Sequence, residues 1–203
     1  MSKIPFKQLL DELYVQLQIA KSPVLDFMNS GIDRVVIQSK FNTINVEPPA
    51  EVYDLYEWKN GLKEEIMNGG KTIGEMRLFT SAIFPNFNFS YQAHINFSSA
   101  GYWEKSHFPI FCSGVGDYYV IECDKTSLSY GKVFYFSPSD PDFEGLIAIY
   151  DSLSALIVTA IECYKSKAYT IGILNSLKED LPAVIEISKL NNPESEYWKL
   201  DWN

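Results

Sequence analysis

The chain has 203 residues, 46% of them hydrophobic, and its 26 acidic and 17 basic residues give a formal net charge of −9. This much apolar surface can form a core, which excludes a mainly disordered chain. The negative field repels nucleic acid and anionic membranes, so we expect neither as a partner.

The first forty residues predict helices and one short strand. Apolar residues recur at three- and four-residue steps between residues 6 and 18, which places them on one helical face. Residues 21–23 interrupt this helix with a proline, and a second helical piece is expected from Pro23 to Gly31. Residues 34–38 are rich in β-branched side chains, which is typical of a short strand.

A proline pair marks the start of the next predicted helix. Pro49 suits the first helical turn, where its missing N–H costs nothing. Asn60 and Gly61 can supply the left-handed residue that ends the helix. The polar, glycine-containing segment 63–74 predicts a loop that has room for one helical turn.

The middle of the chain predicts strands. Residues 76–97 are rich in aromatic side chains, but Pro85 and several asparagines argue against one continuous element. Residues 108–112, 118–123 and 132–137 predict three strands, of which the last two pair antiparallel.

The last third predicts helices. The clearest one runs from Phe143 to Lys165, and because it carries Asp151 and Glu162 it is not a membrane span. Shorter helical pieces are expected over residues 171–177 and after Pro182. Helices and strands therefore group along the chain rather than alternate, which predicts the α+β class.

The cysteines and the N-terminus indicate the compartment. Cys112, Cys123 and Cys163 are widely spaced, which supports neither a disulfide framework nor a zinc site. No apolar segment near Met1 resembles a signal peptide. We expect reduced thiols, a cytoplasmic location, and neither a metal nor another cofactor.

Gly114-Val115-Gly116-Asp117 is the sharpest motif. Because it leads into a strand rather than a helix, a phosphate-binding loop is disfavoured. We interpret it as a tight turn in which glycine allows a positive φ and Asp117 bonds to nearby amides.

Three other features leave alternatives open. His107 with Cys112 could act as a nucleophilic pair, and Glu122 with Asp124 could bind a metal, although ordinary core and surface roles are favoured. The aromatic residues of the last two strands either form an exposed binding row or lie under helices. The aromatic tail 194–203 docks either on its own domain or on another molecule.

Two of these segments together resemble the SUKH superfamily, which includes the yeast Smi/Knr cell-wall regulators and bacterial immunity proteins. The first is the proline-opened helix ending in Asn-Gly, and the second is the Gly-x-Gly-Asp turn with its strands. The matching residues are Pro49, Tyr53, Asn60, Gly61, Gly114, Gly116, Asp117, Asp124 and Gly131, with Trp103 as the upstream tryptophan. Pro48 stands where the family usually has leucine. The resemblance covers about 41–169 of a single domain 1–203, with a helical N-terminal segment 1–40 and a C-terminal extension 170–203.

The resemblance implies a mixed, largely antiparallel sheet packed against N-terminal and C-terminal helices, with no enzymatic activity. It also implies an immunity protein that neutralises a cognate toxin, and the charge favours a basic, nuclease-like one. The alternative is a Smi/Knr-type regulatory scaffold that binds a cellular protein or small ligand. The oligomeric state stays open. The candidate partner-binding residues are Trp103, His107, Asp117, Tyr118, Glu122 and Asp124.

Overall fold

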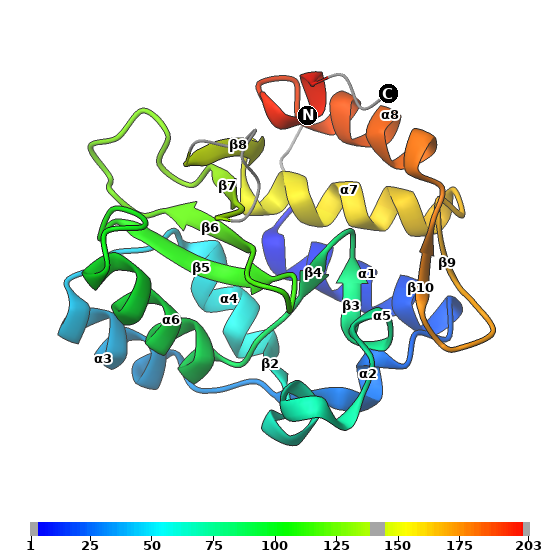
Figure 1. Ribbon diagram of the computed structural model, residues 1–203, viewed down its shortest axis with the longest axis horizontal. Helices are drawn as coiled ribbons and strands as arrows, with labels where there is room; N and C mark the ends of the chain where they lie inside the picture. Colours follow the sequence, from blue (N-terminus) through cyan, green and yellow to red (C-terminus); the bar gives the residue numbers. More distant parts are fainter. Residues whose placement is uncertain (1–3, 139–144, 201–203) are drawn as a thin grey trace.

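A computed structural model describes residues 4–138 and 145–200, and Figure 1 shows its arrangement. The helices are α1 (Phe6–Ile19), α2 (Val24–Phe27), α3 (Arg34–Ile44), α4 (Ala50–Trp58), the π-helical η1 (Ile66–Gly70), α5 (Ile73–Met76), α6 (Phe87–Ser99), α7 (Leu153–Lys165), α8 (Leu181–Asn191) and the 3₁₀-helix η2 (Tyr197–Lys199). The strands are β1 (Met28–Ser30), β2 (Lys59–Leu62), β3 (Arg77–Phe79), β4 (Ala82–Ile83), β5 (His107–Cys112), β6 (Tyr118–Glu122), β7 (Val133–Phe136), β8 (Leu146–Tyr150), β9 (Tyr169–Ile171) and β10 (Leu177–Glu179).

One six-stranded sheet forms the centre of the molecule. Its strands follow chain order, β3-β4-β5-β6-β7-β8, and every described pair is antiparallel. Two further pairs, β1–β2 and β9–β10, stand apart from it. The predicted α+β class is confirmed, and so are the three predicted central strands and the antiparallel pairing of the last two.

Helices cover the sheet on both sides. α6 packs along β5, and α7 packs against both α1 and α8 (Figure 1). Every residue of β5 and β6 is buried. Tyr119 contacts the rings of Tyr135 and Tyr150, whereas Tyr118 contacts Phe97 and Trp103. The aromatic row therefore lies inside the fold rather than forming an exposed binding surface.

The strand predicted at residues 34–38 is wrong, because these residues begin α3. Ile37 and Phe41, four positions apart, are fully buried, whereas Val35 is 76% exposed. This burial follows the helical period and not the alternation of a strand. The β-branched residues favour a strand locally. The packing of Ile37 and Phe41 in the core favours a helix instead, and it overrode this preference.

The long helix predicted from Phe143 to Lys165 is in fact a strand followed by a helix. Phe143 lies outside the described residues, and β8 precedes α7. Ser152 separates them, and its hydroxyl accepts a hydrogen bond from the Ala155 amide at 3.0 Å, which is an N-cap. The apolar run is compatible with both periods, so the cap decides the boundary.

Two other helical predictions are also corrected. Residues 171–177 form the turn and ends of the β9–β10 hairpin, with Asn175 at φ 54°. α2 ends at Phe27, and the chain then enters β1 instead of continuing to Gly31. The helix predicted after Pro182 is confirmed as α8, whose N-cap is Asp180.

The helix that begins after Pro49 ends earlier than predicted. α4 stops at Trp58, and Asn60 and Gly61 belong to β2. Gly61 does adopt the left-handed conformation, with φ 58°, but it does so inside the strand. The Asn60 side chain accepts a hydrogen bond from the Phe87 amide at 2.8 Å, which ties β2 to the start of α6.

Within the described residues, the aromatic tail docks on its own chain. Trp198 is only 2% exposed and contacts the ring of Tyr150. The Ser195 hydroxyl and the Glu196 amide both donate to the Ala148 carbonyl of β8, each at 3.1 Å. The tail therefore covers the end strand of the central sheet.

Candidate partner-binding site

The Gly-x-Gly-Asp segment is a tight turn between β5 and β6. Gly114 and Gly116 have φ angles of 84° and 116°, which glycine adopts without strain. The Ser113 hydroxyl accepts hydrogen bonds from the amides of Val115 and Asp117. Among the described residues, the Asp117 carboxylate accepts one from the Ser137 hydroxyl at 2.7 Å and none from the nearby amides that we predicted as donors.

A buried histidine and glutamate face each other at the other end of these strands. His107 lies opposite Glu122 in the β5–β6 register, with His107 Nε2 3.5 Å from Glu122 Oε2. Glu122 Oε1 also accepts a hydrogen bond from the Asp124 amide at 2.8 Å. Burial lowers the pKa of His107, although the charge of Glu122 opposes this shift. The imidazole is therefore held toward its neutral form.

We predict that the folded protein loses stability as the pH falls below neutrality. Burial lowers the pKa of both histidines, His94 and His107, in the folded state. Below about pH 6.5 the unfolded chain therefore binds more protons, and the free energy of unfolding falls until the folded pKa values are reached. Each pKa unit of depression removes about 1.4 kcal/mol. Urea titrations across this pH range measure the loss.

The control for this prediction is the double variant His94→Gln/His107→Gln, which should show a flatter pH profile. Glu179, whose pKa burial raises, contributes with the opposite sign as the pH rises above its ordinary range. The decisive quantity is therefore the difference between the wild type and the variant in the slope of the free energy of unfolding against pH. Equal slopes would refute the prediction.

The six candidate residues divide between the two ends of the sheet. Trp103 stacks on Phe97 with ring centroids 4.8 Å apart and lies beside Tyr118, near the Gly-x-Gly-Asp turn. His107, Glu122 and Asp124 lie at the opposite end. Asp124 is exposed and Asp117 is partly exposed, whereas the other four are buried. Their role in partner binding stays a prediction, and only the two aspartates can be reached directly.

The nucleophilic His107–Cys112 pair, which the sequence left open as the less favoured alternative, does not form. The two residues occupy opposite ends of β5, which a rise of about 3.3 Å per residue separates by about 16 Å. Burial raises the pKa of Cys112 to about 12, which disfavours the thiolate. The described residues also contain no group of three or more His, Cys, Asp or Glu side chains placed to hold a metal ion.

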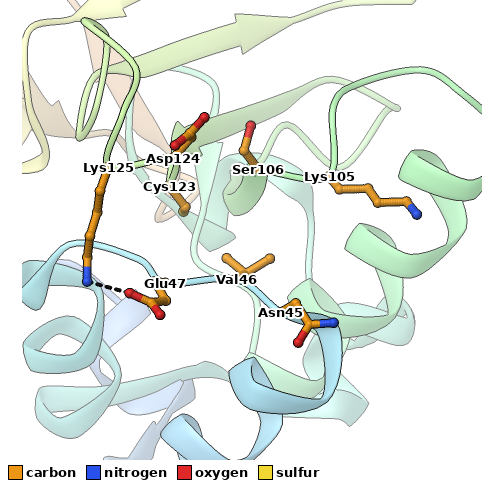
Figure 2. A pocket seen from close by; sticks show the side chains of 8 residues that line it. All are labelled: Asn45, Val46, Glu47, Lys105, Ser106, Cys123, Asp124 and Lys125. Atoms are coloured by element: carbon orange, nitrogen blue, oxygen red, sulfur yellow. Dashed lines mark hydrogen bonds and ion pairs between the residues drawn. The ribbon is translucent and has the colours of Figure 1, made fainter.

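A cleft opens at the Asp124 end of the sheet, and Figure 2 shows it closely. Its volume is about 310 Å³. Three segments meet there: the link between α3 and α4, the approach to β5, and the residues after β6. We call it the loop cleft, and its lining residues are Asn45, Val46, Glu47, Lys105, Ser106, Cys123, Asp124 and Lys125.

Local structure holds the rim of the loop cleft in place. Asn45 ends α3 in the left-handed conformation, with φ 54°, and turns the chain toward Glu47. Lys125 forms an ion pair with Glu47 across the cleft (Figure 2). The Asp124 carboxylate accepts hydrogen bonds from the amide and hydroxyl of Thr126, at 2.8 and 2.7 Å. These bonds to an ionised acceptor keep the pKa of Asp124 low, so the rim carries its negative charge.

The loop that follows Asp124 carries an exposed apolar side chain. Leu128 is fully exposed at its tip, while backbone hydrogen bonds such as Ser127 N to Asp124 O and Gly131 N to Glu122 O fix the loop. Sequence reasoning missed both Leu128 and Glu47. A lone leucine in the otherwise polar segment 124–131 was the available signal, whereas nothing near Glu47 in the sequence pointed to Lys125.

A second hollow of about 340 Å³ lies at the opposite end of the sheet. Gly114, Gly116 and Tyr118 line one side of it, and Met67 and Lys71 line the other. The loop cleft and this second hollow therefore lie at opposite ends of β5 and β6.

The curled antiparallel sheet, its proline-opened helix α4 and its glycine turn define an α+β module whose surface features are loops and clefts. The chain belongs to the SMI1 / KNR4 family (SUKH-1), whose family model matches residues 32–159. Members of this family are generally immunity or regulatory modules. Among the curated proteins, none matches the chain significantly. No helix within the described residues is long and apolar enough to span a membrane.

Proposed function

We propose that this protein is a non-enzymatic immunity protein that binds and neutralises a toxin. The toxin is a basic polypeptide with the positive charge that is typical of a nuclease. Membership of the SMI1 / KNR4 family is the observation that carries the proposal. The net charge of −9 supports it, because opposite charge accelerates association with a basic partner. A nuclease needs a positive surface to hold its substrate, which matches such an inhibitor.

The loop cleft and the adjoining loop are the surface that we assign to the toxin. The loop is fixed before binding, so little conformational entropy is lost when Leu128 enters a pocket on the partner. The exposed carboxylate of Asp124 supplies negative charge beside this apolar anchor, whereas the charge of Glu47 is already paired with Lys125. An apolar centre with a charged rim is the usual anatomy of a protein interface.

The second candidate is a regulatory module that binds a cellular protein or small ligand. The hollow beside Gly114 and Tyr118 favours it, because apolar side chains and one lysine, Lys71, converge there. Its interaction surface would then lie at the opposite end of β6 from Leu128.

Capture from the native host tests the proposal. The immobilised protein is washed at low salt, and bound polypeptides are identified by mass spectrometry. We expect a basic polypeptide that stops growth when expressed alone and loses this effect when our chain is co-expressed. Calorimetry should then show affinity that falls as salt is raised. A partner that is acidic, or harmless when expressed alone, would count against an immunity role.

Two matched variants distinguish the surfaces. Leu128→Arg places a positive charge in the proposed interface and should weaken toxin binding by at least about tenfold. Val115→Arg makes the same change at an exposed aliphatic residue in the turn at the other end of β6, and should leave affinity unchanged. The reverse result would assign the partner to the hollow beside Gly114.

A further inference from the structure

The β9–β10 hairpin lies outside the region matched by the family model, and its strand β9 has one free edge. β10 contacts β3, so it occupies the side of the hairpin nearer the central sheet, and β9 lies on the outer side (Figure 1). A free strand edge presents unpaired N–H and C=O groups that can pair with another chain.

The hydrogen-bond register shows which groups face outward. Gly172 N donates to Ser176 O at 2.9 Å, and Asp180 N donates to Ala168 O at 2.8 Å. Because bonded positions alternate along an antiparallel pair, Thr170 faces β10, whereas the N–H and C=O groups of Tyr169 and Ile171 point away. In the part of the chain that the structure describes, no hydrogen bond is made to these outward groups.

An apolar groove runs beside this free edge. It has a volume of about 430 Å³ and lies between β9 and the C-terminal ends of α1 and α7. Ile19, Ala20, Tyr164 and Ile171 form its apolar lining, and Ile19 is 69% exposed. A strand added to β9 would point alternate side chains toward and away from this groove.

The charge around the groove is opposite to that of the whole chain. Lys165 and Lys167 line it, Lys21 directly follows Ala20, and no acidic residue is among the lining residues. Lys165 is paired with Glu12 at 2.8 Å. A second copy of the chain would bring lysines against lysines, which like-charge repulsion disfavours. An acidic segment complements the groove.

We propose that the β9 edge binds an extended acidic peptide that also carries aliphatic side chains, which adds a third strand to the hairpin. Backbone hydrogen bonds to Ile171 hold the peptide, because Ile171 is partly exposed whereas Tyr169 is only 2% exposed, and an aliphatic side chain enters the groove. The lysines select acidic residues on the peptide. This site is separate from the loop cleft, so it does not depend on the proposed immunity function.

Fluorescence anisotropy with a labelled peptide of alternating glutamate and valine tests the site. We expect it to bind at least about tenfold more tightly than the same peptide with lysine in place of glutamate. Ile171→Pro removes an outward N–H without removing a β9–β10 bond, and should weaken binding about tenfold. Ile171→Val keeps the N–H and the branched side chain, and should bind like the wild type.

Lys167→Asn keeps the test decisive if Ile171→Pro fails to fold. Lys167 has φ 65°, which asparagine tolerates, so this variant removes only the charge. It should weaken binding and reduce its dependence on salt. In the wild type, the peptide should slow hydrogen exchange at the amide of Ile171. Absence of binding at millimolar peptide, equal affinity of the two peptides, or a dimer formed through β9 would each overturn the proposal.

Discussion

Replacing Gly61 by alanine is expected to lower the free energy of unfolding by more than about 4 kcal/mol, or to prevent folding altogether. Gly61 has φ 58°, and a Cβ atom there would lie 2.1 Å from the Pro85 carbonyl oxygen and 2.5 Å from the Asn86 nitrogen. Both atoms belong to the backbone that leads into α6, so no side-chain rotation relieves the clash. Urea denaturation followed by circular dichroism, together with the soluble yield, measures the effect.

Gly101→Ala is the matched control for this prediction. Gly101 also has a positive φ, 78°, but nothing lies within 4 Å of its Cβ position. Its replacement should therefore cost only the left-handed backbone penalty of about 1–2 kcal/mol. If the two variants lose equal stability, the close approach of β2 to the Pro85 segment does not matter, and the account of Gly61 fails.

Gly61 also illustrates what local sequence can and cannot predict. The Asn60-Gly61 pair correctly indicated a left-handed residue, because few residues other than glycine and asparagine adopt it easily. It did not indicate that the residue would lie in a strand against Pro85. That requirement comes from a contact between segments far apart in the chain, which only tertiary packing creates.

The errors in predicted secondary structure have a common cause. The segment from Leu146 to Ile161 is apolar enough to be compatible with one continuous helix. Its first residues nevertheless form β8, which pairs with β7. Ser152 alone marked the boundary. In contrast, β6 and β7 were predictable, because aromatic and β-branched residues stand in short runs bounded by turns.

The candidate site was only partly predictable. Sequence reasoning pointed to Asp124, which lines the loop cleft, but grouped it with Trp103 and Tyr118 from the other end of the sheet. Closeness in sequence to the Gly-x-Gly-Asp motif does not show which end of a strand a residue occupies. Glu47 reaches Lys125 across 78 positions, a pairing that no local pattern could indicate.

Replacing Trp198 by alanine is expected to lower the free energy of unfolding by about 3–5 kcal/mol, as for other buried aromatic side chains. Trp198 is 2% exposed and packs against the rings of Tyr150 and Tyr197. It lies outside the residues matched by the family model. If Trp198→Ala lowers the free energy of unfolding strongly and the protein still unfolds in one cooperative transition, the C-terminal extension folds as one unit with the matched domain. Calorimetry measures both the stability and the cooperativity.

Two further variants sharpen the test of Trp198. Leu200→Ala removes a partly exposed side chain from the same tail and should change stability by less than about 0.5 kcal/mol. Trp198→Phe keeps a ring in the site and removes an indole N–H that has no hydrogen-bond partner among the described residues, so it should cost less than the alanine variant. If Trp198→Ala leaves the main transition unchanged, the tail unfolds separately. Its cover over β8 would then contribute nothing to the stability of the sheet, and the predicted single domain over residues 1–203 would be wrong.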